Sequence, residues 1–460
     1  MFRLIKNELV KVFAKISTYL MLGIVLLFVV GMALLMKMSS QYSEHQYIYN
    51  KENIQFEIAY LESSKPQGYE LELKRYEYMK DSGKEWEADS WQLNALEESF
   101  ITWQSPLVYD GDSLSEEQKN QYQSNFDNEI AAVLQDDWDA YAGQKLKQIN
   151  EGTDSDAVKA AKGYYYEYMM EQNIQPGSDD WREDVARQVA FSRTDLEELK
   201  VKEAKGDYVS EDSKEQLQNE LALNEYRLEH NLSTYMDEDG NTDSTFWNSF
   251  REGKAVLTFA SVVLIVLAGG CVANEFSTGT IKFLLVNPVK RGKIIISKYL
   301  TLILLSVALI FLLYGFTALV NLLVQKSPDL GMPLLKAAGG VVSVKSPWIH
   351  LLGQYLLGGV NLLAMTTMAF MISSLLRNSA VAIGIGVAAL MGGNILVMIL
   401  AQFGQDWGRY VLFANLDLTS ISQGYGLFPN QTPAFAIGTI VVYVVIFLVT
   451  AYDAFTRSEV

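Results

Sequence analysis

Residues that carry metal or redox chemistry are scarce in this sequence. There is one cysteine, Cys271, which lies in an apolar run, so an internal disulfide framework and a multi-cysteine metal site are excluded. The three histidines, His45, His230 and His350, are scattered along the chain, which argues against a histidine metal site. We therefore expect no metal in this chain.

The sequence also lacks the GxxxxGK[ST] loop that cradles nucleotide phosphates. Gly253-Lys254 is followed by alanine and Gly292-Lys293 by isoleucine, so neither pair completes the motif. We expect that the chain itself is not an enzyme and holds no cofactor. If ATP is used, a separate chain binds it.

Acidic and basic residues are divided unevenly. The 460 residues carry a formal net charge of -17, but residues 40–253 hold 47 acidic and 20 basic side chains, whereas the remainder holds 7 acidic and 17 basic. A soluble globule would mix these compositions, so the sequence indicates a membrane protein with one large acidic, water-exposed insertion. An acidic domain repels a phosphate backbone, which disfavours nucleic acid as a partner.

Stretches without Asp, Glu, Lys or Arg are long enough for membrane-spanning helices, each of which needs about 20 residues. There are six, at 16–36 and within 255–273, 299–325, 346–376, 378–405 and 418–452. The first is too long for a signal-peptide core and no small-residue cleavage site follows it, so we expect an uncleaved helix over 16–39. The sequence predicts an all-α membrane protein with six transmembrane helices, five of them in a membrane domain over 254–460.

Basic residues beside short loops give an orientation, because such residues favour the cytoplasmic side. They gather before the first span and between the second and third, at Arg3, Lys6, Lys11, Lys15, Lys282, Lys290, Arg291, Lys293 and Lys298. We therefore expect both termini in the cytoplasm, residues 40–253 outside the cell and the turn at Arg377-Asn378 inside.

Residues 1–15 are amphipathic. Apolar residues recur at helical spacing, with basic residues displaced to the other side, and the apolar face includes Phe2, Ile5, Leu9 and Phe13. The pattern predicts a cytoplasmic interfacial helix that lies on the lipid bilayer. The alternative is a continuous extension of the first span.

The insertion at 40–253 has only three prolines and is rich in residues that favour helix, so it is predicted to be a helical extracellular domain. Ser113 to Glu116 has capping-box spacing and predicts the start of a helix. The acidic turn 237–241 could hold calcium, but its spacing does not match a twelve-residue calcium loop, so a solvated turn is favoured. The aromatic run 164–168 is either a contact surface for an amphiphilic substrate or a partner subunit or, as favoured, packs in the domain core or at its junction with the membrane.

The connection between the second and third spans, residues 274–298, reads NEFSTGTIKFLLVNPVKRGKIIISK. Residues 275–285 can form a short helix, Asn287-Pro288 ends it, and a basic group leads into the next span. A short cytoplasmic helix between two spans gives a soluble partner a surface to push.

This segment resembles the corresponding part of the permease subunits of the type-2 ABC exporter family. The resemblance rests on residue types in a fixed order, at Glu275, Gly279, Thr280, Leu284, Leu285, Pro288, Arg291 and Lys298. The amphipathic N-terminus, the six spans and the turn 373–378 add to it. The resemblance covers residues 1–39 and 254–460, whereas compact family members have only a short outer loop in place of the insertion.

The resemblance implies the membrane-spanning permease subunit of an ATP-driven exporter of a peptide, an antimicrobial or a lipid-like molecule. Two ABC ATPase subunits would bind ATP and Mg, and a second permease copy or a related permease would complete the complex. Segment 274–298 would be the coupling segment, with an ATPase contact that includes Glu275, Phe276, Gly279, Thr280, Leu284, Pro288 and Arg291. Glu275 is then expected at the protein surface, where it supports little of the core.

An alternative is a non-pumping six-span scaffold or receptor component of a secretion apparatus. A proton-driven carrier is disfavoured because the predicted spans contain no Asp, Glu, Lys or Arg.

Overall fold

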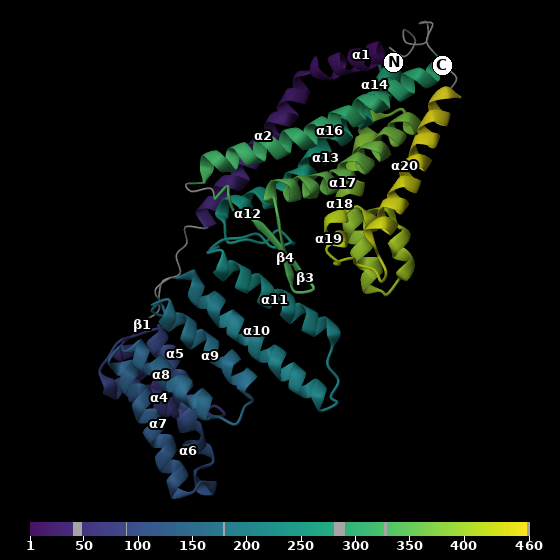
Figure 1. Ribbon diagram of the computed structural model, residues 1–460. Helices are drawn as coiled ribbons and strands as arrows, with labels where there is room; N and C mark the ends of the chain where they lie inside the picture. The colour runs from purple at the N-terminus through teal and green to yellow at the C-terminus, as the bar shows by residue number, and fades with distance from the viewer. Residues whose placement is uncertain (40–47, 89, 178–179, 280–289, 326–328, 458–460) are drawn as a thin grey trace. The chain divides into compact units, whose positions relative to one another are not determined.

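The computed structural model describes residues 1–39, 48–88, 90–177, 180–279, 290–325 and 329–457, which are mostly helical and form two compact units (Figure 1). The first unit comprises Met1–Tyr42, Thr234–Leu334 and Lys345–Val460, and the second comprises Ser43–Ser233 and Leu335–Val344. The chain therefore passes from one unit to the other at four points.

Among the residues that the structure describes, the first unit contains six helices that are long and apolar enough to cross a membrane. They are α2 (Ile16–Ser39), the run from α12 to α14 (Thr245–Ser277), α16 (Arg291–Val324), α17 (Pro347–Leu376), α18 (Ser379–Gln402) and α20 (Pro433–Thr456). Each corresponds to one uncharged stretch of the sequence, because hydrocarbon accepts a chain whose backbone is hydrogen-bonded internally and whose side chains are apolar. The chain is a multi-pass membrane protein.

The second of these helical runs is composite. It consists of α12 (Thr245–Glu252), the short 3₁₀ segment η3 (Gly253–Ala255), α13 (Val256–Cys271) and α14 (Ala273–Ser277). The rings of Phe246, Trp247 and Phe250 are fully buried in a hydrophobic cluster. Trp247 donates to the carbonyl of Asp329 (2.6 Å) and Tyr355 of α17 donates to that of Phe250 (3.2 Å). These bonds satisfy polar atoms that burial would otherwise leave unpaired.

A separate helix precedes the first span. α1 (Phe2–Phe13) is followed by a break at Ala14 and Lys15, and α2 begins at Ile16. The Thr18 hydroxyl donates to the carbonyl of Val12 (2.8 Å), a backbone acceptor at the end of α1. α1 and α2 are therefore two helices rather than one continuous extension, and the placement of α1 on a bilayer surface stays a prediction.

The acidic turn Asp237–Asn241 belongs to the first unit. The Asp237 carboxylate accepts from the backbone amide (2.7 Å) and the side-chain amide (2.9 Å) of Asn241, so the turn is held by its own hydrogen bonds. It borders a polar pocket of about 510 Å³ together with α17 and α19 (Leu418–Ser422). Two 3₁₀ segments, η4 (Asp406–Tyr410) and η5 (Leu412–Asn415), connect α18 to α19.

The second unit is also mostly helical. Its helices are α3 (Lys51–Ser64), α4 (Tyr69–Ser82), α5 (Trp91–Ser99), α6 (Ser105–Tyr109), α7 (Glu116–Leu134), α8 (Trp138–Glu151), α9 (Asp156–Glu171), α10 (Trp181–Ala204) and α11 (Glu211–Glu229). A π-helical segment, η1 (Phe100–Gln104), joins α5 to α6, and a 3₁₀ turn, η2 (Gly111–Ser113), follows α6. The predicted capping box is wrong by two residues, because the cap of α7 is Ser115, which bonds reciprocally with Gln118.

The aromatic run of α9 contributes to the core of the second unit, as the favoured interpretation predicted. The rings of Tyr165 and Tyr166 lie 6.0 Å from the ring of Trp138, and Met169 is fully buried. Tyr164 is at the edge of this core, where the guanidinium of Arg193 lies 4.2 Å from its ring centre. Burial raises the pKa of the Tyr165 and Tyr166 hydroxyls well above the ordinary range.

Short strands correct the expectation of an all-α protein. β1 (Ile48–Tyr49) pairs antiparallel with β2 (Trp86–Glu87), and β3 (Leu334–Ala338) pairs with β4 (Val341–Lys345). Gly339 and Gly340 join β3 to β4 with φ values of 57° and 74°, which suits a two-residue hairpin turn. The side chain of Asn219 in α11 accepts from the Gly340 amide (2.9 Å), so this hairpin is attached to the second unit.

Candidate functional site

The junction between α13 and α14 is fixed by a serine of α17. The Ser373 hydroxyl donates to the carbonyl of Gly269 (2.7 Å) and accepts from the amides of Val272 (3.4 Å) and Ala273 (3.0 Å). Ser373 is fully buried. Its hydroxyl replaces backbone bonds that are lost where one helix ends and the next begins. α17 therefore sets the direction in which α14 leaves the second span.

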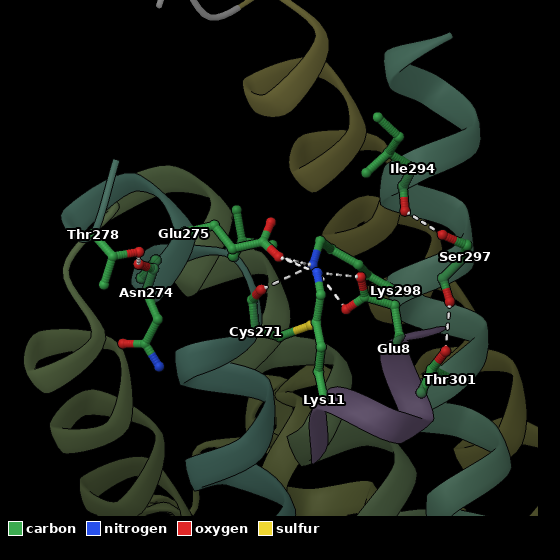
Figure 2. A network of polar contacts seen from close by, with 12 residues as sticks. Glu8, Lys11, Cys271, Asn274, Glu275, Thr278, Ile294, Ser297, Lys298 and Thr301 are labelled. Carbon is green, nitrogen blue, oxygen red and sulfur yellow. Dashed lines mark hydrogen bonds and ion pairs between the residues drawn. The ribbon is translucent and has the colours of Figure 1, made fainter. Parts of the chain in front are cut away.

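Four charged side chains meet beside this junction, in what we call the Lys298 network: Glu8 and Lys11 of α1, Glu275 of α14 and Lys298 of α16 (Figure 2). Lys298 donates to Glu275 (2.7 Å), to Glu8 (2.9 Å) and to the backbone carbonyl of Cys271 (3.3 Å). Lys11 donates to Glu8 and to Glu275, both at 2.9 Å. The N-terminal helix α1 is thus joined at one point to α14 and α16, which lie more than 250 residues later in the sequence.

The network is largely withdrawn from solvent. The side chain of Lys298 is 1% exposed, and those of Glu275 and Glu8 are 12% and 13% exposed, whereas Lys11 is 49% exposed. Two carboxylates and two ammonium groups balance in charge, which offsets the cost of burying them. Burial disfavours the charged form of Glu8, but Lys298 and Lys11 outweigh it and hold the pKa of Glu8 below its ordinary value.

The aromatic ring of Phe276 makes a second connection from α14. The guanidinium of Arg377 lies 4.8 Å from its ring centre, and the ring of Phe455 in α20 meets it nearly edge-on at 6.3 Å. Arg377 ends α17 in a left-handed conformation (φ 50°), and Asn378 caps α18 by accepting from the amides of Ala380 and Val381. The predicted turn at Arg377-Asn378 is therefore present, and it contacts the proposed coupling segment.

The structure brings part of the predicted ATPase contact together. Glu275 and Phe276 are in the cluster just described, and Gly279 follows α14 with φ 71°. The guanidinium of Arg291 donates to the carbonyl of Thr456 at the end of α20 (3.4 Å), one residue beyond the Phe455 that Phe276 contacts. Three further residues of the prediction lie outside the described residues: Thr280, Leu284 and Pro288.

The residues predicted for the interfacial helix divide into two groups. Ile5 and Leu9 are half-buried, on the side of α1 that also carries Glu8. Phe2 and Phe13 are 81% and 40% exposed. The apolar surface of α1 is therefore only partly used inside the chain, and two large rings stay available for lipid.

The expectation that Glu275 is a surface carboxylate is wrong, because its side chain is mostly buried and bonded to two lysines. Sequence reasoning also missed Glu8, and it missed that Lys298 is the common partner of Glu8 and Glu275. A signal was present: Glu8 is the only acid in residues 1–43, and Glu275 is the only acid in 253–328. An isolated acid in a basic, apolar surrounding has few partners available, which favours a specific ion pair.

The fold and this site define a multi-pass membrane protein whose second span ends in a short helix attached to four other elements. The chain belongs to a family described as a protein of unknown function (DUF2705), whose model matches residues 222–460. The matched range includes α14 and α16 of the Lys298 network but not α1.

Two relatives come from Bacillus subtilis strain 168. One, described as uncharacterized protein YhcI, is 33% identical over 244 residues, which are 52% of this chain and 75% of the relative. The other, described as uncharacterized membrane protein YdbK, is 30% identical over 220 residues, which are 48% of this chain and 85% of the relative. Both relatives are shorter than this chain, since about half of it covers most of each of them.

Proposed function

We propose that this chain is the membrane-spanning permease subunit of an ABC exporter whose separate ATPase subunits bind and hydrolyse ATP. The attachment of α14 carries the proposal. Ion pairs connect it to α1 and α16, backbone hydrogen bonds to Ser373 connect it to α17, and a ring contact connects it to α20. A partner that displaces α14 therefore acts on four elements at once, which is what a coupling segment requires.

In this proposal the coupling segment 274–298 docks into an ATPase that holds ATP and Mg. Closure of two ATPase subunits draws the coupling segments of two permeases together, and the second permease is either a copy of this chain or a related one. Lys298 then transmits the displacement, because the same ammonium group binds Glu275 of α14 and Glu8 of α1. The proposed cargo is a peptide, an antimicrobial or a lipid-like molecule, which is exported through the spans.

The proposal includes an orientation. Both termini and α14 are cytoplasmic, α1 lies on the inner surface of the bilayer, and the acidic helical domain inserted between the first two spans is extracellular. Support comes from the distribution of basic residues. The contacts of Lys11 with Glu275 and of Phe276 with Phe455 agree with it, because they place α1, α14 and the end of α20 at one end of the first unit (Figure 1).

Cysteine labelling tests this orientation. In a Cys271→Ala background, Tyr208→Cys should react with a membrane-impermeant maleimide in intact cells, because Tyr208 is 93% exposed and lies in the proposed outer domain. Asn7→Cys, on the exposed side of α1, should react only after the cells are permeabilised. Labelling of Asn7→Cys but not of Tyr208→Cys in intact cells would reverse the orientation and remove the coupling role of α14.

Photocrosslinking tests the proposed partner directly. Ser277 is exposed on α14, so a benzoylphenylalanine placed there in living cells should form a covalent product with an ATPase. Mass spectrometry of that product should identify a polypeptide that contains a GxxxxGK[ST] loop. The same group at Tyr208 is the control and should not capture it. If no such polypeptide is captured at Ser277, or if Tyr208 captures it equally, the non-pumping scaffold becomes the better explanation.

A further inference from the structure

An apolar groove runs between α16, α17 and α20 in the first unit. It has a volume of about 370 Å³, and its walls include Ile296 and Tyr299 of α16, Phe370 of α17, and Val449 and Tyr452 of α20. Side chains at its edges are open to the surroundings, since Ile296 is 43% and Val449 is 62% exposed. All three helices are long and apolar enough to span a membrane, so the groove faces hydrocarbon.

The walls of the groove offer little polar chemistry to a ligand. The hydroxyl of Tyr299 is paired with that of Thr367 (3.0 Å), so the ring presents carbon to the groove. The remaining lining side chains are aliphatic or aromatic. An occupant must therefore be apolar along this length.

One end of the groove is closed and basic. The guanidinium of Arg291 reaches the carbonyl of Thr456, and a Cβ on Gly292 would lie 2.6 Å from the Tyr452 hydroxyl, so α16 and α20 approach closely there. Lys293 is exposed and lies three residues before Ile296, on the same side of α16. The first turn of α16 contains no acid.

A second exposed lysine, Lys290, precedes α16 at this end. Within α20 itself (433–456), the acid is Asp453, which pairs with Arg457 (2.5 Å) and is neutralised by it. The closed end is therefore positively charged, while the rest of the groove is apolar.

We propose that this groove is a binding site for an anionic phospholipid, with one acyl chain between α16 and α20 and the headgroup beside Lys290 and Lys293. An acyl chain matches the apolar walls, and a negatively charged headgroup complements the basic end. A second copy of the chain fits less well, because copies in one membrane share an orientation and would bring the same basic residues to the same depth. The site does not depend on the proposed transport function.

Lipid titration of the full chain in detergent, followed by native mass spectrometry, tests the site. The probes are phosphatidylglycerol and phosphatidylcholine with identical acyl chains. We expect phosphatidylglycerol to bind at least about tenfold more tightly, since each nearby Lys or Arg contributes about fivefold. Lys293→Gln should lower the affinity for phosphatidylglycerol about fivefold and leave the affinity for phosphatidylcholine unchanged. Lys15→Gln removes an exposed lysine outside the groove and should have no effect.

A second pair of variants separates the groove from general lipid contact. Val449→Trp should fill the groove and weaken the binding of both lipids. Val441 is 53% exposed on the same helix but lies outside the groove, so Val441→Trp should leave the binding of both lipids unchanged. Equal binding of the two lipids to the unmodified chain would overturn the proposal, as would equal losses in Lys15→Gln and Lys293→Gln. Dissociation of a dimer by Val449→Trp, with lipid binding retained, would assign the groove to a second copy instead.

Discussion

Replacing Lys298 with methionine is expected to lower the free energy of unfolding of the first unit by about 3 to 5 kcal/mol. The reason is that Glu8 and Glu275 would stay in a site where they are 13% and 12% exposed, with Lys11 as their remaining lysine partner in the network. The measurement is chemical unfolding in mixed micelles, with the variant compared to the unmodified chain. The loss should be accompanied by release of α1, detected as faster hydrogen exchange of its amides.

Two further variants separate buried from exposed charge in this network. Lys11→Met should cost only about 0 to 1 kcal/mol, because Lys11 is 49% exposed. The triple variant Glu8→Gln, Glu275→Gln and Lys298→Met should recover much of the stability, because it leaves no uncompensated charge among these buried groups. Equal losses of unfolding free energy in Lys298→Met and Lys11→Met would contradict the conclusion that burial makes Lys298 the more important of the two lysines for stability.

Replacing Ser277 with tryptophan is expected to reduce ATP hydrolysis by the complex at least about tenfold, a loss of about 1.4 kcal/mol in coupling. Ser277 is exposed, and its hydroxyl donates to the carbonyl of Asn274 within the same helix (3.1 Å). A bulky ring there obstructs a docking partner and leaves the Lys298 network intact. ATPase activity would be measured with the ATPase that the Ser277 crosslinker captures.

The control for this variant is Arg457→Trp, since Arg457 is 81% exposed at the end of α20. It should change neither ATP hydrolysis nor complex yield by more than about twofold, because substitutions of exposed residues have small effects. Both variants should unfold at the same denaturant concentration as the unmodified chain. Normal ATP hydrolysis and normal complex yield in Ser277→Trp would remove α14 from the ATPase interface.

The membrane spans could be predicted from the sequence because one physical requirement determines them. A helix surrounded by hydrocarbon needs about 20 residues without charge, and such stretches are visible one by one. The start of α7 was missed by two residues because Ser113 and Ser115 both carry a hydroxyl that could cap a helix. Only the backbone geometry shows that Ser115 is the cap. The hairpin of β3 and β4 was missed because Leu334 to Lys345 is a short segment with no long alternating pattern.

The candidate site was harder to predict because it is made of contacts between distant residues. The sequence pointed to Glu275 and Phe276 as part of an ATPase contact but gave no partner for either within this chain. Glu275 bonds to Lys298, 23 residues later, and to Lys11, 264 residues earlier. The local periodicity of the sequence cannot reveal such ion pairs, because they form only when α1, α14 and α16 pack together. The coupling role of this site stays a prediction.

The long separation of Glu8 from Lys298 also sets an order of events during synthesis. The two residues are 290 positions apart, so at a translation rate of about 5 to 20 residues per second roughly 15 to 60 s pass between them. For that time the N-terminal segment exists without the lysine that later binds it. If α1 lies on the bilayer as proposed, the exposed rings of Phe2 and Phe13 would hold the segment at the lipid surface while the ribosome continues. The sequence of this segment therefore has two requirements to meet. It must first suit a nascent peptide on a bilayer, and later a helix docked against the rest of the chain.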